Sequence, residues 1–190
     1  MIKNNIRRES YLKFLNTWKN RDLIKVLSGV RRSGKSTLLA MFQQDLKEQG
    51  VQDENIIAIN FEYMEFEELT DYRKLHDYVL SKVDKNKKNY VFLDEIQHVQ
   101  NFEKVVDSLY IRDYIDLYIT GSNAFFLSGE LATLLTGRYI EQHVLPLSFQ
   151  EFKQWHTENN PTIQQLSNRD LYASVMFKDE RWIRKFEQQL

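Results

Sequence analysis

Short apolar runs alternate with amphipathic stretches along most of the chain. Five runs have the length of strands, and they lie at residues 23–28, 56–61, 90–96, 115–120 and 139–145. Elsewhere apolar residues recur every three or four positions, which predicts helices over residues 9–19, 35–48, 70–83, 102–110, 129–136 and 148–156. The run IIAINF at 56–61 is almost continuously apolar, so we expect helices to cover both faces of that strand. The alternation predicts an α/β domain with a mainly parallel five-stranded sheet.

The end of the chain has a different pattern. Residues 157–170 are polar and contain Pro161, which indicates a boundary. We therefore expect one domain over residues 1–156, and a linker with the start of a truncated or missing C-terminal region over residues 157–190. Just before the boundary, Ser148 and Glu151 have the spacing of a capping box, which predicts a helix start.

Composition and charge exclude several classes of protein. The formal net charge is −1 and the sequence pI is about 6.4, so no overall field attracts nucleic acid or an anionic membrane. The absence of cysteine excludes a disulfide framework and thiolate-bound metals. No apolar run reaches the roughly 18 residues of a membrane-spanning helix. We expect a cytoplasmic protein without a membrane partner.

Residues 29–36, GVRRSGKS, match the phosphate-binding pattern G-x-x-x-x-G-K-[ST] between a predicted strand and a predicted helix. Glycines let the backbone turn and approach a phosphate closely, and the N-terminus of the helix attracts an anion. Lys35 is expected to reach the β- and γ-phosphates, and the Ser36 hydroxyl to ligate Mg²⁺. The expected nucleotide contacts are Gly29, Val30, Arg31, Arg32, Ser33, Gly34, Lys35, Ser36 and Thr37.

The third predicted strand runs directly into two acids, Asp94 and Glu95. An acid at a strand tip can hold the Mg²⁺ shell opposite the phosphate loop, which is the role we expect for Asp94. Glu95 could polarise a water molecule for attack on the γ-phosphate. A glutamate beside the metal acid favours transfer to water over transfer to a small molecule.

Polar residues also follow the fourth predicted strand. Ligands of open α/β sheets bind at the carboxyl ends of strands, so Ser122 or Asn123 is expected to sense the γ-phosphate, with a plain strand-to-helix cap as the alternative. Arg138, before the fifth strand, could be an arginine finger for its own or a neighbouring subunit, or a structural ion-pair partner. The expected catalytic residues are Glu95, Lys35, Arg138, Ser122 and Asn123.

Other charged residues allow two interpretations each. Arg31 and Arg32 are either exposed cations that attract a polyanion or direct contacts to the nucleotide or an acidic partner. Residues 7–11, which include Arg8 and Tyr11, either lie near the adenine or begin a surface helix. Glu62 follows the second strand and could support Glu95 or a magnesium-bound water molecule.

The sequence resembles the AAA-type P-loop ATPases of the bacterial and archaeal ATPase group. The stretches that carry the resemblance are LSGVRRSGKSTLL, YVFLDEIQ, ITGSNAFFLSGELATLLTGRY and VLPLSFQEF. The resemblance implies a three-layer sandwich with sheet order 5-1-4-3-2, ATP at the tips of strands 1, 3 and 4, and a further C-terminal domain similar to a winged helix followed by a nuclease-like region. It also implies ATP hydrolysis coupled to work on a partner.

The sequence is compatible with two functions that belong to different classes. The first is a magnesium-dependent ATPase domain that acts on an unknown protein or DNA partner and could form a homo-oligomer. The second is a nucleotide-gated interaction module with negligible turnover of its own. No base-reading motif separates ATP from GTP.

Overall fold

The computed structural model describes residues 6–122, 135, 137–148 and 151. Residues 7–146 form one compact unit, and residues 1–6 and 147–190 group as a second unit. The first unit contains the sheet and the candidate site. Within the residues that the structure describes, no helix is long and apolar enough to cross a membrane.

A five-stranded parallel sheet forms the centre of the first unit. Its strands are β1 (Ile24–Ser28), β2 (Ile56–Asn60), β3 (Asn89–Asp94), β4 (Ile115–Gly121) and β5 (Tyr139–His143). They lie in the order β2-β3-β4-β1-β5, and every neighbouring pair is parallel. The predicted order 5-1-4-3-2 is therefore confirmed. Because all strands run the same way, their carboxyl ends meet at one edge of the sheet.

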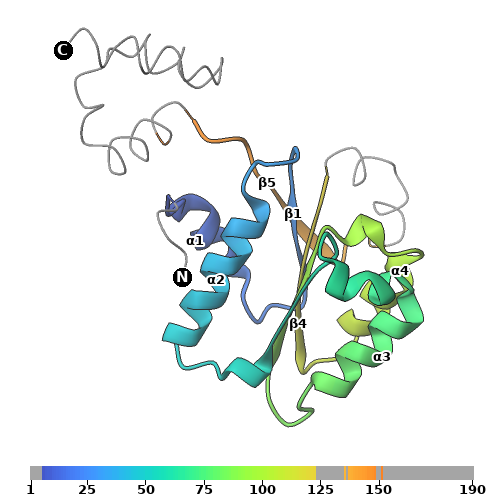
Figure 1. Ribbon diagram of the computed structural model, residues 1–190. Coiled ribbons are helices and arrows are strands. Elements are labelled where there is room, and N and C mark those ends of the chain that lie inside the picture. Colours follow the sequence, from blue (N-terminus) through green and yellow to red (C-terminus); the bar gives the residue numbers. More distant parts are fainter. Residues whose placement is uncertain (1–5, 123–134, 136, 149–150, 152–190) are drawn as a thin grey trace, which may run out of the picture. The chain divides into compact units, whose positions relative to one another are not determined.

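Helices cover both faces of the sheet and complete the three layers (Figure 1). On one face lie α1 (Glu9–Trp18) and α2 (Lys35–Glu48), and on the other lie α3 (Tyr72–Lys82) and α4 (Phe102–Tyr110). The α2 face contains an aromatic cluster in which the rings of Phe92 and Tyr118 stack at 4.7 Å and Phe42 lies 5.3 Å from Tyr118. Asp71 caps the start of α3, and its carboxylate accepts hydrogen bonds from the N–H groups of Arg73 and Lys74.

The prediction that both faces of the 56–61 strand are covered is wrong. Ile57 and Ile59 of β2 are buried, but Ala58, which points to the other face, is exposed. The reason is the place of β2 at the edge of the sheet, where α2 packs over the central strands instead. Three short 3₁₀ turns not expected from periodicity lie at Asp53–Asn55, Met64–Thr70 and Ile96–His98.

At the amino end of the sheet, a buried ion pair joins β1 to β4. The Lys25 ammonium donates to Asp116, and both side chains are almost fully buried. Asp116 also accepts hydrogen bonds from the Tyr118 hydroxyl at 2.8 Å and from the N–H of Asn20 at 2.9 Å. Burial lowers the pKa of Lys25, and the neighbouring Asp116 partly offsets that effect.

Several predicted features lie wholly or largely outside the described residues. They include the helix at 129–136, most of the helix at 148–156 and the proposed boundary at 157. The predicted capping box is confirmed, because the N–H of Ser148 donates to Glu151 at 2.7 Å and the N–H of Glu151 donates to Ser148 Oγ at 3.2 Å.

Candidate functional site

The loop between β1 and α2 depends on two glycines for different reasons. Gly29 has φ +149°, and a Cβ atom there would lie 2.3 Å from the carbonyl oxygen of Val144. Its missing side chain therefore admits the chain leaving β5, a reason that the motif alone did not reveal. Gly34 has φ +97° with open space around it, so it is required for its left-handed backbone just before α2.

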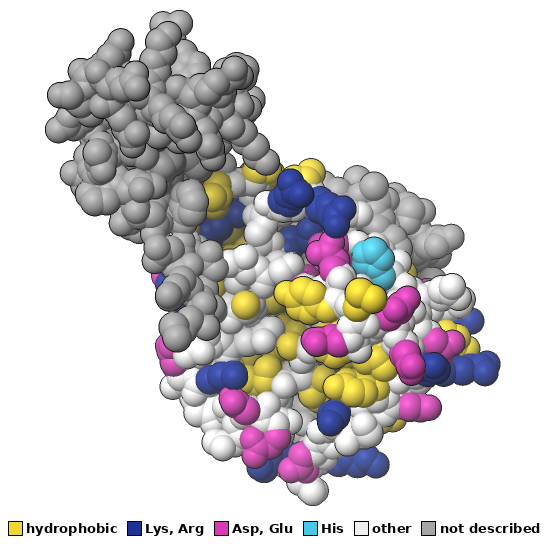
Figure 2. All heavy atoms as spheres, in the orientation of Figure 1, with side chains coloured by type: hydrophobic (Ala, Val, Ile, Leu, Met, Phe, Trp, Pro, Cys, Tyr) yellow, Lys and Arg dark blue, Asp and Glu magenta, His cyan; other side chains and the backbone are white. Residues whose placement is uncertain are grey.

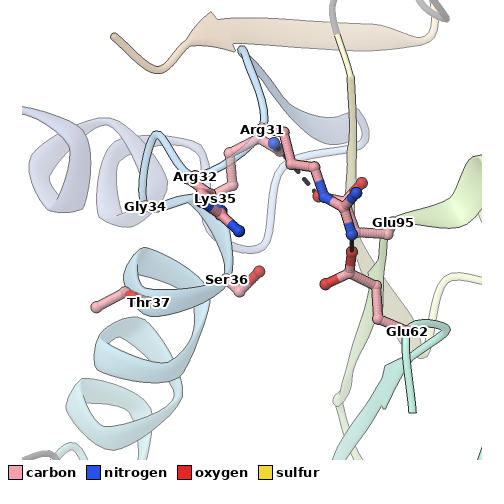
Figure 3. A pocket seen from close by; sticks show the side chains of 8 residues that line it. All are labelled: Arg31, Arg32, Gly34, Lys35, Ser36, Thr37, Glu62 and Glu95. Atoms are coloured by element: carbon pink, nitrogen blue, oxygen red, sulfur yellow. Dashed lines mark hydrogen bonds and ion pairs between the residues drawn. The ribbon is translucent and has the colours of Figure 1, made fainter. Parts of the chain in front are cut away.

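The loop forms one wall of a hollow of about 410 Å³ (Figure 3). The opposite wall carries Glu62, which follows β2, and Glu95, which follows β3. The residues that line the hollow are Arg31, Arg32, Gly34, Lys35, Ser36, Thr37, Glu62 and Glu95. The structure thus brings the phosphate-loop motif and the second acid of the predicted pair into one cavity.

Lys35 is held across this hollow. Its side chain is 3% exposed, and its ammonium lies 3.3 Å from Glu95 Oε1. The same ammonium donates to the carbonyl oxygens of Gly29 at 3.1 Å and Val30 at 3.4 Å. Because the ammonium already has three alternative acceptors, it can exchange one of them for a phosphate oxygen. The backbone of Lys35 stays at the first turn of α2 during this exchange.

Asp94 is buried at the tip of β3 and is fixed by two neighbouring strands. Its carboxylate accepts a hydrogen bond from the Thr120 hydroxyl on β4 and another, at 2.8 Å, from the Asn60 amide on β2. Burial raises the pKa of Asp94, while hydrogen bonds from Thr120 and Ser36 act in the opposite direction. Sequence reasoning missed Asn60 and gave Thr120 no contact with Asp94, although both residues stand at strand ends.

The donor set fits a magnesium ion held mainly by a substrate. Asp94 and Ser36 offer a carboxylate and a hydroxyl, which are ligands that Mg²⁺ accepts. Within the described ranges, no cluster of three or more acidic or histidine side chains could hold a metal by itself. A site of this kind fits Mg²⁺, because that ion keeps several water molecules and commonly binds through one or two protein groups plus phosphates.

Glu95 has an unusual backbone and three hydrogen-bonded or charged neighbours. Its φ is +58°, a left-handed conformation that is uncommon outside glycine, and its N–H donates to Thr120 Oγ1 at 2.9 Å. Besides the Lys35 contact, its carboxylate accepts a hydrogen bond from the Gln97 amide at 2.5 Å. Thr120 therefore bridges both acids, and Gln97, which sequence reasoning also missed, fixes the second one.

The exposed rim of the hollow is charged. Figure 2 shows Lys and Arg side chains gathered where the loop after β1 lies, with acidic side chains beside them. Arg31 donates to Glu62 at 2.7 Å, so the structure pairs Glu62 with the loop instead of with Glu95. Arg32 is exposed, lines the same hollow and has φ +66°.

Arg8 lies behind the loop. Its guanidinium donates to the carbonyl oxygens of Ser33 at 3.3 Å and Leu145 at 2.8 Å, and it stacks 4.4 Å from the centre of the Tyr11 ring. Residues 7–11 do begin helix α1, as one of the two interpretations expected, with Arg8 at its N-cap position. A role of these residues near the adenine stays a prediction. Arg8 itself is only 8% exposed, so it is buried at the start of that helix. Its neighbour Arg7 is half-exposed and pairs with Asp45 at 2.8 Å.

Arg138 lies at the other end of the sheet. Its carbonyl accepts a hydrogen bond from the N–H of Ile24, the first residue of β1, and its guanidinium pairs with Asp107. The loop of the hollow follows the last residue of β1, so it lies at the opposite end of this strand from Arg138. The prediction that Arg138 is an arginine finger for its own subunit is therefore wrong. A role toward a neighbouring subunit stays a prediction. Ser122 directly follows β4, and Asn123 lies outside the described residues.

Two relatives share much of this sequence. An uncharacterised protein of Haemophilus influenzae is 47% identical over 153 residues, which cover 80% of this chain and 38% of the relative. An uncharacterised protein of Methanocaldococcus jannaschii is 38% identical over 141 residues, which cover 72% of this chain and 29% of the relative. The chain thus spans well under half the length of these relatives.

Solved structures support the fold. The ORC1 protein of Aeropyrum pernix, solved in complex with DNA, has a TM-score of 0.61 at 11% identity, over 91% of this chain and 56% of that one. RIF2 of Saccharomyces cerevisiae has a TM-score of 0.54 at 16% identity, over 89% and 68%. The family model described as AAA domain matches residues 21–153. The C-terminal domain that the resemblance implies stays a prediction. The resemblance to AAA-type P-loop proteins is itself confirmed, and the chain belongs to the AAA domain family of P-loop proteins.

Proposed function

We propose that this chain binds ATP with Mg²⁺ in the hollow and hydrolyses it to ADP and phosphate. The observation that carries the proposal is the contact between the two motifs, with Lys35 of the loop 3.3 Å from Glu95 beyond β3. This contact sets a phosphate-binding cation and a candidate base on opposite sides of one cavity. The AAA domain family supports nucleotide binding by such a cavity.

Each residue has a separate part in the proposed reaction. Backbone N–H groups of the loop and the Lys35 ammonium bind the phosphates, and Ser36 and Asp94 hold Mg²⁺, which neutralises phosphate charge when bound. Glu95 accepts a proton from the attacking water molecule as its oxygen bonds to the γ-phosphorus. The bond from that phosphorus to the bridging oxygen of ADP breaks, and Lys35 stabilises the charge that develops there.

The Lys35–Glu95 contact also gives an order of events. A triphosphate that binds Lys35 competes with the Glu95 carboxylate for the same ammonium. Once Lys35 has moved to the phosphates, the Glu95 carboxylate oxygen that faced the ammonium can accept a hydrogen bond from a water molecule. The Gln97 hydrogen bond to the other carboxylate oxygen would keep Glu95 oriented during that exchange.

Two variants test the proposal. Lys35→Ala removes the buried cation, and we expect it to weaken ATP binding by about a hundredfold or more, since charge-assisted hydrogen bonds to phosphate are strong. Glu95→Gln keeps the shape of the site without a base, so we expect ATP binding to survive and turnover to fall by about a hundredfold or more. Calorimetry measures the first effect and phosphate release the second. Hydrolysis at the parental rate by Glu95→Gln would remove Glu95 from the mechanism.

A second candidate function is a nucleotide-gated interaction module. It is favoured by the position of Arg138, which leaves the hollow without this arginine unless a neighbouring subunit supplies one. In that case the lone chain binds ATP and changes its affinity for a protein or DNA partner with negligible turnover. Phosphate release measured with and without duplex DNA separates the two candidates, because multiple turnovers by the chain alone contradict the second.

A further inference from the structure

Two ion pairs cross the hollow from the phosphate-binding motif at residues 29–36. Lys35 reaches Glu95 and Arg31 reaches Glu62, at 3.3 Å and 2.7 Å (Figure 3). The first pair belongs to the proposed reaction already described. The second involves an arginine that the phosphate-loop pattern does not require, at one of its variable positions.

The Arg31–Glu62 pair contributes little to the fold. The Arg31 side chain is 80% exposed and that of Glu62 is 39% exposed, and such surface pairs add little to stability. Both side chains nevertheless line the hollow, and Figure 3 shows the Arg31 side chain extending toward Glu62 rather than out from the loop. A cation held this way is easily transferred to a stronger anion that enters the same space.

Glu62 stands near the acid that is proposed to hold magnesium. Its N–H donates to Asn60 Oδ1 at 2.9 Å, and the Asn60 amide donates to Asp94 Oδ2 at 2.8 Å. Two hydrogen bonds thus connect the partner of Arg31 to Asp94. In the proposed function Asp94 would help to hold the metal beside the terminal phosphate, and the contacts through Glu62 and Asn60 place Arg31 on the same side of the site.

We propose that Arg31 is a ligand of the γ-phosphate, and that ATP takes this arginine from Glu62. The inference rests on the proposed function and adds a means by which the site distinguishes ATP from ADP. A planar guanidinium can donate two parallel hydrogen bonds to phosphate oxygens, and the γ-phosphate offers more charge than the Glu62 carboxylate. ADP lacks the group that competes for Arg31, so the Arg31–Glu62 pair persists when ADP binds.

The first test compares two nucleotides on one variant. Calorimetry with Mg²⁺ measures the affinities for ADP and for an ATP analogue with a non-hydrolysable β–γ bridge. We expect Arg31→Ala to weaken binding of the analogue at least about tenfold more than binding of ADP. The matched control is Arg32→Ala, which removes the same charge from the same loop and should change both affinities by similar factors. Retained ADP binding shows that Arg31→Ala is folded.

The second test asks whether Glu62 competes. Glu62→Gln should strengthen binding of the ATP analogue several-fold more than binding of ADP, because the competing carboxylate is gone. This gain should disappear when Glu62→Gln is combined with Arg31→Ala, since the arginine that Glu62 holds is then absent. A gain that persists in the double variant overturns the exchange of Arg31 between Glu62 and the γ-phosphate.

The outcomes separate this inference from the proposed function. If the parent protein binds neither nucleotide, the proposed function fails and the inference fails with it. If the parent binds both, and Arg31→Ala loses equal factors for both or no more than Arg32→Ala does, the hollow is a nucleotide site but Arg31 is no γ-phosphate ligand.

Discussion

At the scale of single residues, the two acids at the end of β3, Asp94 and Glu95, are held by side chains that lie outside the recognised motifs. The Thr120 hydroxyl donates to Asp94 and accepts from the N–H of Glu95, and Asn60 donates to Asp94 from the other side. These partners come from β4 and β2, the two neighbours of β3 in the sheet. The strand order therefore fixes the position of both acids.

Gly29 provides a first prediction at this scale. Gly29→Ala would place a Cβ atom 2.3 Å from the Val144 carbonyl in a left-handed backbone, so we expect it to lower the free energy of unfolding by about 2 kcal/mol or more. The control is Gly50→Ala, where φ is +90° but the space is open. We expect that variant to lose only about 1 kcal/mol. Urea denaturation measures both, and equal losses would contradict the close approach of β5 to Gly29.

The buried pair Lys25–Asp116 gives a second prediction. Asp116→Asn leaves the Lys25 ammonium buried without its counter-charge, so we expect a loss of about 3 kcal/mol or more in the free energy of unfolding. Adding Lys25→Met removes the uncompensated charge, and the double variant should be more stable than Asp116→Asn alone. Urea denaturation decides this, and a double variant that loses the sum of both single effects would contradict it.

The free energy of unfolding of Asp116→Asn should also depend on pH in a defined direction. Burial lowers the pKa of Lys25 in the folded protein, while the unfolded chain has the ordinary value of about 10.4. Between these two values the unfolded chain binds more protons, so stability rises with pH and is lost as pH falls toward the lowered pKa. Asp116→Asn removes the main effect that raises this pKa, so its stability should depend on pH over a wider range than that of the parent.

At the scale of elements, the sequence predicted the strands and the four described helices well. The apolar runs and the helical periodicity are local signals, and the predicted and observed elements differ by a few residues at their ends. The covering of β2 could not be predicted this way. IIAINF is apolar in either position, and only the edge position of β2 decides that Ala58 stays exposed.

The residues of the candidate site also fall into those that local sequence signals identify and those that only the fold brings together. Lys35 and Glu95 could be found because the motif fixes their spacing to a strand end, and the structure brings them together. Thr120, Asn60 and Gln97 join the site through contacts between strands or across a turn. No spacing in the sequence encodes such contacts, although the polar residue at each strand tip is a usable signal.

At the scale of the whole molecule, Arg138 raises the question of a second subunit. It lies at the amino end of β5, while the hollow lies at the carboxyl end of β1 in the same parallel pair. An arginine finger at Arg138 is therefore predicted only toward a neighbouring subunit.

Mixing two inactive variants tests this prediction. Lys35→Ala has a damaged hollow but an intact Arg138, and Arg138→Ala has the reverse. If the arginine acts between subunits, the mixture should release phosphate at least about tenfold faster than either variant alone, because removal of such an arginine costs at least that factor. A mixture of Lys35→Ala with Glu95→Gln is the control, since both changes damage the same hollow. Absence of recovery in the first mixture contradicts an intersubunit role for Arg138.

The contacts of Arg8 have a consequence for the energetics of binding. One rigid guanidinium spans the carbonyls of Ser33, in the phosphate loop, and Leu145, just beyond β5, so the curvature of the loop is set when the chain folds. A ligand that meets such a loop does not have to order it. The conformational entropy of the loop is then lost during folding and not during binding. More of the free energy of the ligand contacts therefore contributes to affinity.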